Sequence, residues 1–279
     1  MADTIIDLIK ASADFLSRKN ISNPRLEAEI LLADLLGCER IHLYARFDRA
    51  LDEDQKNNYR QRIVERGKNK PSAYILGKKH FHKYEFAVNE NVLIPRPETE
   101  ELVDFVLKSD LPEDAKILDL CCGTGCIGIT LLLERPGYHV DFSDLSLPAL
   151  EICRRNAASL GVTERSSFFQ GNLFENILNE KYDAICTNPP YIRPEEKDSL
   201  SSDVLFEPES ALFHPDPVSL YREIFQGALS RLKSDGFFIG ELSPFCAEGV
   251  LEAGKSLFAT AFLIKDLSGK NRFFAGKGL

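Results

Sequence analysis

Residues 116–128 read Lys-Ile-Leu-Asp-Leu-Cys-Cys-Gly-Thr-Gly-Cys-Ile-Gly. The short apolar run Lys116–Leu120 is typical of a buried strand, and the glycine-rich turn that follows leads into a helix. Such a turn lets a ligand approach the backbone closely, and it points the free N–H groups of the helix toward that ligand. The stretch therefore predicts a strand, a turn and a helix, with a ligand site beyond the carboxyl end of the strand.

Similar apolar runs recur along the chain, with helical segments between them. The runs are Lys116–Leu120, Tyr138–Ser143, Ser166–Phe169, Tyr182–Thr187 and Gly236–Glu241. This alternation is typical of a mostly parallel sheet that is covered by helices on both faces. We therefore predict an α/β fold for this part of the chain.

The first 70 residues have a different character, because their apolar residues recur at helical spacing. Ile5, Ile9 and Leu16 would share one helix face, and Asn23-Pro24 supplies a capping residue and a first-turn proline for the next helix. Aromatic residues then mix with turn-forming residues near Asn89, which indicates a β-hairpin. We predict a helical domain over 1–78, a hairpin linker over 79–96 and an α/β domain over 97–279.

The charge is distributed unevenly. The chain has 34 Lys+Arg and 43 Asp+Glu, for a net charge of −9. Residues 1–80 hold 15 of the basic and 12 of the acidic residues, so the acidic excess lies in the α/β part. That argues against stable nucleic-acid binding, which depends on neutralising phosphates. The basic stretch Lys56–Lys83 is either a solvated helix face or a docking patch for an acidic or nucleic-acid-associated partner.

Several functions are disfavoured by what the chain lacks. No run of about 20 apolar residues occurs, so no membrane span is expected. Residues 1–4 are acidic rather than basic, which disfavours a secretory signal. The seven Cys include a crowded group at 121, 122 and 126 but no pair spacing typical of a zinc site, and the five His are scattered. We expect free thiols, no metal, a cytoplasmic location and a monomer.

An acidic residue follows the second strand at the distance expected for nucleoside binding. Asp144 lies about 20 residues beyond the glycine turn, where a carboxylate can accept both hydroxyls of a ribose. The loop Asn172-Leu173 follows the third strand, so Asn172 could reach an adenine edge and Leu173 could pack on the base. An NAD site would usually have G-x-G-x-x-G directly after the strand. The turn here instead reads D-x-C-x-G-x-G.

The fourth strand runs into Asn188-Pro189-Pro190-Tyr191. The two prolines fix φ and remove two backbone donors, so a rigid row of carbonyl acceptors remains beside the Asn188 amide. The Asn188 side-chain oxygen and the Pro189 carbonyl can each accept one N–H of a planar NH2 group, and Tyr191 can offer a flat face to it. The tetrapeptide therefore predicts a site for an amide or an exocyclic amine.

An amide nitrogen is a poor nucleophile, because its lone pair is delocalised into the carbonyl. An enzyme that alkylates such a nitrogen must mainly align it with an activated group and exclude water, and no catalytic acid or base is obligatory. From the tetrapeptide alone, adenine N6, cytosine N4 and glutamine N5 all remain candidate acceptors. Two functions remain as alternatives to an enzyme that acts on a glutamine side chain. One is a nucleic-acid methyltransferase, and the other is a non-catalytic nucleotide-binding adaptor.

The turn D-x-C-x-G-x-G resembles the S-adenosylmethionine loop of seven-stranded methyltransferases, which usually reads D-x-G-x-G-x-G. Nearly the full chain resembles the release-factor glutamine methyltransferases, the HemK/PrmC family. The resemblance rests on five blocks of sequence. These are Pro71–Gly77, Val92–Val103 with its Ile94-Pro95-Arg96-Pro97-Glu98-Thr99-Glu100 core, Asn172–Phe174, Asn188–Ile192 and Phe206–Leu212.

The resemblance implies a Rossmann-like seven-stranded sheet and a helical N-terminal domain that helps to grip a protein substrate. It also implies transfer of a methyl group from S-adenosyl-L-methionine to the glutamine of the Gly-Gly-Gln motif in class I peptide chain release factors. By matching positions, the residues that bind the cofactor are Cys121, Cys122, Gly123, Thr124, Gly125, Asp144, Asn172, Leu173 and Asn188. Those that bind the glutamine and form the catalytic set are Asn188, Pro189, Pro190 and Tyr191.

Some positions depart from the family pattern or remain open. Cys121 stands where the family has the first glycine of the loop, and we expect a cysteine there only with a negative φ. The family also usually has Asp at position 172 and often an aromatic residue at 173. Arg96 and Glu100 form either an ion pair or part of the pocket wall. Glu207 either braces the acceptor loop or begins a helix.

Overall fold

The computed structural model describes residues 4–177 and 180–278, so the expected acidic start of the chain lies largely outside the described residues. The chain divides into two compact units. The first comprises residues up to Lys78 together with Ser201–Phe206, and the second comprises Lys79–Leu200 and the residues from Glu207 onward. Among the described residues, no helix combines the length and the apolar character needed to cross a membrane.

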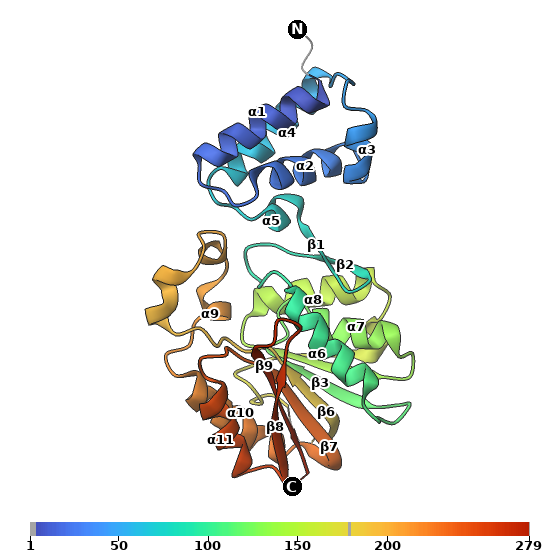
Figure 1. Cartoon of the computed structure of the whole chain (residues 1–279). Coiled ribbons are helices and arrows are strands. Elements are labelled where there is room, and N and C mark those ends of the chain that lie inside the picture. Colours follow the sequence, from blue (N-terminus) through green and yellow to red (C-terminus); the bar gives the residue numbers. More distant parts are fainter. Residues whose placement is uncertain (1–3, 178–179, 279) are drawn as a thin grey trace. The chain divides into compact units, whose positions relative to one another are not determined.

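The first unit is helical, as its periodicity predicted (Figure 1). Its helices are α1 (Ile5–Arg18), α2 (Pro24–Leu35), α3 (Arg40–Ala45), α4 (Glu53–Arg66) and α5 (Ser72–Leu76). Capping boxes at Thr4 and Asp52 begin α1 and α4. Asn23 precedes α2 with φ +50, but its side chain makes no capping hydrogen bond, so the capping role expected of it is not found.

The core of this unit lies between α1, α2 and α4, where the apolar faces of the three helices meet. Leu16, Leu31 and Leu32 are fully buried in it. Tyr59 of α4 is also buried, and its hydroxyl donates to the Ala28 carbonyl of α2 at 3.0 Å. The polar group of this large side chain is thus satisfied inside the core.

A buried arginine joins a distant segment of the chain to the first unit. Arg66, at the end of α4, is only 1% exposed. Its Nε donates to Glu27 at 2.7 Å, and its two terminal nitrogens donate to Asp203 at 3.1 and 2.5 Å. Ser202 adds a hydrogen bond to Asn69 at 3.0 Å. Arg66 is therefore buried, whereas the first of the two interpretations of the basic stretch Lys56–Lys83 placed it on a solvated helix face.

The predicted hairpin, β1 (Lys78–Phe81) and β2 (Tyr84–Ala87), belongs to the second unit except for Lys78 at its start. A seven-stranded sheet follows with the order β5-β4-β3-β6-β7-β9-β8. Its strands are β3 (Lys116–Leu120), β4 (His139–Asp144), β5 (Ser166–Gln170), β6 (Tyr182–Thr187), β7 (Leu232–Glu241), β8 (Thr260–Lys265) and β9 (Asn271–Lys277). The first five strands are parallel, and β9 pairs antiparallel with both β7 and β8.

The five apolar runs in the sequence correspond to β3 through β7. The last two strands were not among the predicted runs, although each contains a short apolar stretch. β8 lies at the edge of the sheet, where Ala261–Ile264 is only partly buried, and β9 beside it carries the buried stretch Phe273–Gly276.

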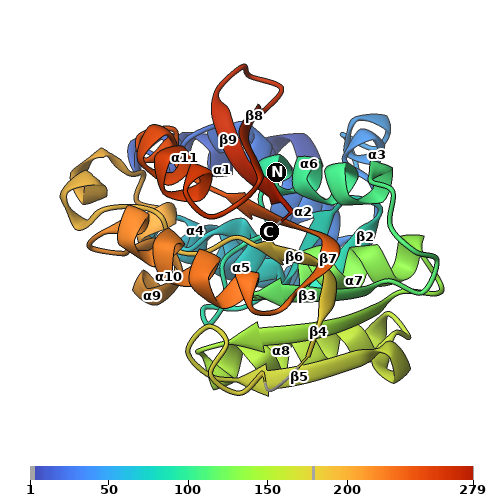
Figure 2. The ribbon, with the colours of Figure 1, turned by 90° about the horizontal axis from the view of Figure 1, so that it is seen from below.

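Helices cover both faces of this sheet (Figure 2). On one face lie α6 (Pro97–Lys108), α7 (Cys126–Glu134) and α8 (Leu147–Ser159), and on the other lie α10 (Pro217–Leu229) and α11 (Ala247–Lys255). The second face is rich in aromatic residues. Phe225, Phe238 and Phe274 pack together, and the ring centroids of Phe225 and Phe274 are 4.6 Å apart.

The remaining helical segments are short. They are η1 (Thr163–Arg165), η2 (Pro194–Ser199), η3 (Val204–Phe206) and α9 (Glu209–Leu212). Of these, η3 belongs to the first unit and the other three to the second.

We predict that Arg66→Met destabilises the first unit by about 3 kcal/mol. Removing one member of a buried ion pair leaves its partners uncompensated, and the cost is at the lower end of the range because Asp203 is partly exposed. Hydrogen exchange measured by peptide should rise in α4 and in residues 201–206. Arg60→Met, at an exposed position of the same helix, is the control. Equal protection in the two variants would contradict the buried role of Arg66.

Candidate functional site

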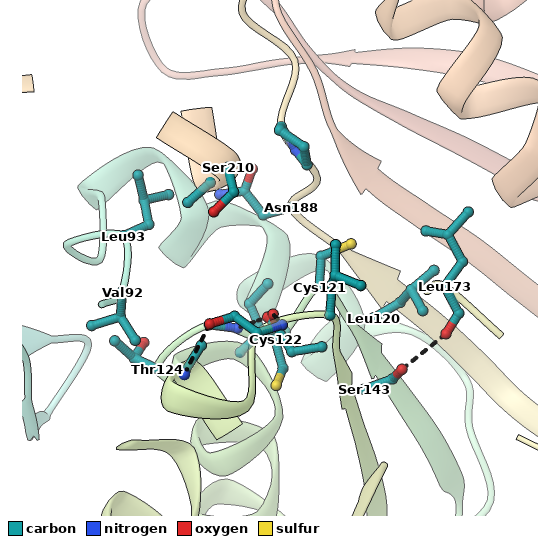
Figure 3. Close-up of a pocket in the computed structure, with 18 of the residues that line it drawn as sticks. Val92, Leu93, Leu120, Cys121, Cys122, Thr124, Ser143, Leu173, Asn188 and Ser210 are labelled. Atoms are coloured by element: carbon teal, nitrogen blue, oxygen red, sulfur yellow. Dashed lines mark hydrogen bonds between the residues drawn. The ribbon is translucent and has the colours of Figure 1, made fainter. Parts of the chain in front are cut away.

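A cavity of about 600 Å³ opens at the carboxyl ends of β3, β4 and β6 (Figure 3). Its volume is in the range of ordinary ligand sites. Figure 3 shows Val92 and Leu93 on one side of the cavity and Leu120 and Leu173 on the other. Most residues predicted for the site line it. These are Cys121, Cys122, Gly123, Thr124, Asp144, Asn172, Leu173, Asn188 and Pro190.

The glycine turn and Asp144 are held together by backbone hydrogen bonds. Gly123 has φ +53, and its N–H donates to Asp144 Oδ2 at 2.8 Å. Asp144 Oδ1 accepts from the Ser146 N–H at 2.8 Å. Burial raises the pKa of Asp144, and these backbone hydrogen bonds oppose the shift. The carboxylate is thus fixed at the cavity wall, and each oxygen keeps a free lone pair for a ribose hydroxyl.

Gly125 has a packing role instead of lining the cavity. It begins α7 with φ +76. A Cβ added there would lie 2.4 Å from the Cys153 sulfur and 2.9 Å from a methyl group of Ile129. Only glycine therefore permits the close approach of this turn to the helices beneath it.

Cys121 has φ +58, so the expectation of a negative φ at this position is wrong. The cysteine adopts the left-handed conformation that glycine favours, and the surrounding fold must impose it. Leu173 does the same at φ +48, with its carbonyl accepting from the Ser143 hydroxyl at 2.9 Å (dashed in Figure 3). Burial raises the pKa of the Cys121 thiol to about 12, which favours the protonated form, and the thiol is a poorer nucleophile than the thiolate.

The charged side chains around the cavity are compatible with a cofactor that carries no phosphate group. Among the described residues, the charged side chains that line it are Arg96, Asp144 and Glu223. Arg96 is already paired with Glu207. The described lining therefore offers no basic cluster that could neutralise a pyrophosphate or a triphosphate. An adenosine carried on a sulfonium needs none, and Asp144 fits its ribose.

The acceptor tetrapeptide divides between the cavity and the layer behind it. Asn188 and Pro190 line the cavity, whereas Pro189 is buried and does not. Tyr191 is also absent from the lining, and its hydroxyl donates to Glu241 at 2.8 Å. The tyrosine is thus anchored by a buried carboxylate.

Glu207 braces the chain between the hairpin and α6. It is 4% exposed, accepts from the Ile94 N–H at 2.9 Å and pairs with Arg96. The helix-start alternative for Glu207 is therefore not observed, since α9 begins at Glu209. Arg96 pairs with Glu207 and not with Glu100, which instead accepts from the backbone of His82.

Two polar residues beside the tetrapeptide received no role from the sequence, and one of them, Thr99, lines the cavity. Thr99 in the first turn of α6 and Glu241 at the end of β7 are 2% and 1% exposed. They hydrogen bond to each other at 2.6 Å, and the Asn188 side chain donates to Thr99 at 3.3 Å. The available signals were the place of Thr99 in the Val92–Val103 block and, for Glu241, an acid at the carboxyl end of an apolar strand.

Comparisons with known proteins agree with this geometry. Residues 7–77 match the family described as the PrmC N-terminal domain, and residues 99–215 match the methyltransferase small domain. A release factor glutamine methyltransferase of Leptospira interrogans is 45% identical over 97% of this chain and 97% of its own length. One from Rhodopirellula baltica is 36% identical over 98% of this chain and 95% of its own.

The chain belongs to the release factor glutamine methyltransferase family. It is therefore an S-adenosylmethionine-dependent methyltransferase, and the predicted family, activity and cofactor are confirmed.

Solved structures confirm the predicted Rossmann-like fold. The hMettl16 catalytic domain has a TM-score of 0.57 at 11% identity, with 84% of each chain covered. A methyltransferase from Pyrococcus furiosus has a TM-score of 0.53 at 16% identity, with 80% of this chain and all of its own covered.

In this methyltransferase we predict that Cys121→Gly is tolerated and Cys121→Val is not. Glycine relieves the left-handed strain, and this gain offsets the lost packing and the greater entropy of the unfolded chain. Valine, which is β-branched, should cost about 2 kcal/mol more than cysteine at positive φ. Thermal unfolding and calorimetric titration of S-adenosylmethionine would measure both effects. A valine variant as stable as the glycine variant would contradict the strained conformation.

Asp119 predicts a pH dependence of stability. It is fully buried, Oδ2 accepts from the Gly128 N–H at 2.9 Å, and Oδ1 has no partner among the described residues. Burial raises its pKa to about 8. The folded state therefore holds a proton that the unfolded state has lost, so this group makes stability fall as pH rises from about 4 to about 8, by up to about 1.4 kcal/mol per pH unit.

Asp119→Asn keeps the shape and removes the titration. Its free energy of unfolding should fall less steeply than that of the wild type between pH 5 and pH 8. Asp144 and Glu241 also have raised pKa values, but both proteins share them, so the difference in slope isolates Asp119. Urea unfolding across this pH range would measure it, and parallel curves would show that Asp119 does not titrate there.

Proposed function

We propose that this protein transfers a methyl group from S-adenosylmethionine to the side-chain amide nitrogen of a glutamine in a peptide chain release factor. The observation that carries the proposal is the position of Asn188. It follows β6, which is paired in parallel with β3, and it lines the same cavity as the glycine turn that follows β3. An amide acceptor and a methyl donor can therefore occupy one cavity.

The proposed reaction is a direct displacement. S-adenosylmethionine supplies an activated methyl group on a sulfonium. The glutamine nitrogen forms the new C–N bond, the S–C bond breaks with its electron pair going to sulfur, and one N–H proton leaves to solvent afterwards. Asn188 Oδ1 accepts one of the two N–H groups, which orients the nitrogen and stabilises the positive charge that develops on it. The Pro189 carbonyl is the proposed second acceptor, and because Pro189 is outside the cavity lining, this carbonyl must turn toward the cavity when the substrate binds. Alignment of this kind can supply roughly 7–11 kcal/mol.

The choice of acceptor rests on the relatives. Those compared above are named release factor glutamine methyltransferases and align over almost the whole chain, including the helical unit. The proposed target is the glutamine of the Gly-Gly-Gln motif, and the helical unit would help to grip the substrate protein. Release factors act in translation, so the proposed location is the cytoplasm.

The test compares acceptors directly. The protein is incubated with methyl-labelled S-adenosylmethionine and with release factor, DNA or RNA in separate reactions. Mass spectrometry of the release factor should find one added methyl on the motif glutamine, with no label in nucleic acid. Label in DNA or RNA and an unmodified glutamine would instead support a nucleic-acid methyltransferase.

We predict that Asn188→Ala lowers kcat by about 100-fold or more, because it removes one of the two oxygens that hold the acceptor. Binding of S-adenosylmethionine should remain measurable by calorimetry. Asn58→Ala, at an exposed position of α4 outside the cavity lining, serves as the control. Normal turnover by the Asn188 variant would refute the role given to this amide.

A further inference from the structure

We propose that Thr99 and Glu241 are positioning residues that lock the Asn188 amide with its oxygen toward the acceptor nitrogen. The lock would also determine specificity, because it makes the site accept an amide and reject a carboxylate. This inference rests on the proposed function and assigns a task to two side chains behind the acceptor site.

The lock begins at the carboxylate of Glu241. This residue is 1% exposed. Its Oε2 accepts from the Thr99 hydroxyl at 2.6 Å, and its Oε1 accepts from the Tyr191 hydroxyl at 2.8 Å. Burial raises the pKa of Glu241, while these two hydroxyls and the nearby Arg272 favour the charged form. Both hydroxyls donate to this carboxyl group, so both hydroxyl hydrogens point toward it.

The Thr99 hydroxyl links Glu241 to the Asn188 amide. A threonine hydroxyl has a single hydrogen, and Thr99 donates it to Glu241. The Thr99 oxygen can then only accept, and it receives Asn188 Nδ2 at 3.3 Å. The nitrogen end of the amide is thereby held at Thr99, and Oδ1 is directed to the other side. The reversed amide would bring two acceptors together and should be roughly tenfold or more less populated.

The sheet register explains why these residues meet. Thr187 of β6 pairs with Gly240 of β7, so Asn188, which follows β6, lies beside Glu241, the last residue of β7. Thr99 reaches them from the first turn of α6. The three residues are far apart in sequence, and the chain brings them together only in the folded unit.

The consequence concerns the acceptor. With Oδ1 presented, Asn188 can receive an N–H from a glutamine side chain but repels the carboxylate of a glutamate. Without the lock the amide could rotate and offer its own NH2, which would favour the carboxylate. Selectivity between glutamine and glutamate therefore reports the orientation of Asn188 independently of the rate.

The test uses Thr99→Val, which removes the hydroxyl at nearly constant shape, and Thr99→Ser, which retains it. Thr130→Val is a matched control, because Thr130 is equally buried but its hydroxyl donates only to the Cys126 carbonyl of its own helix at 2.6 Å. Two quantities are measured, kcat and KM for a Gly-Gly-Gln peptide and inhibition by a Gly-Gly-Glu peptide.

We expect Thr99→Val to lower kcat about tenfold and to shift the binding ratio about tenfold toward the glutamate peptide, with S-adenosylmethionine affinity nearly unchanged. Thr99→Ser should restore both quantities to within about threefold of the wild type. If the valine variant fails to fold, Thr99→Ala must give the same shift in selectivity. A Thr99 variant without the hydroxyl that matches Thr130→Val in rate and selectivity would overturn the lock.

Failure of the proposed function gives a different result. In that case the wild-type protein itself would transfer no methyl group to the glutamine peptide. The ratio of glutamine to glutamate peptide bound by wild type and Thr99→Val then decides the lock alone, and an unchanged ratio overturns it.

Discussion

The site depends on the parallel pairing of β3 with β6. Leu120 lies opposite Thr187 in this register, so the residues that follow, Cys121 and Asn188, leave the sheet side by side at the same edge. Adjacent strands lie about 4.8 Å apart, and this spacing sets how close a ligand on the first loop can come to one on the second. The seven-stranded sheet thereby fixes the geometry that alignment of a weak nucleophile requires.

Local strain and buried charge accompany this geometry. Cys121 and Leu173 hold left-handed conformations in the cavity wall, and Asp119 and Glu241 are buried carboxyl groups directly beside it. Such features cost free energy, and the packed sheet and its two helical layers must supply the compensation. The strained residues and the buried carboxyl groups are concentrated around one cavity. This is expected where the sequence serves ligand binding at the expense of stability.

The sequence was informative where the determinant is local. Asn188 and the glycine turn are contiguous motifs beside apolar strands, so both the fold class and the cavity could be predicted from them. Thr99 and Glu241 could not, because their roles depend on a hydrogen bond between residues 142 positions apart. The bond from Arg66 to Asp203 is hidden in the same way, and so is the membership of residues 201–206 in the first unit.

The most direct measurement is a crystal structure with S-adenosylhomocysteine and a Gly-Gly-Gln peptide. We expect the glutamine nitrogen to lie within hydrogen-bonding distance of Asn188 Oδ1 and the Pro189 carbonyl, facing the sulfur of the bound product with room for a methyl group between them. A glutamine bound elsewhere, or one whose carbonyl oxygen contacts the Asn188 nitrogen, would contradict the proposed acceptor site.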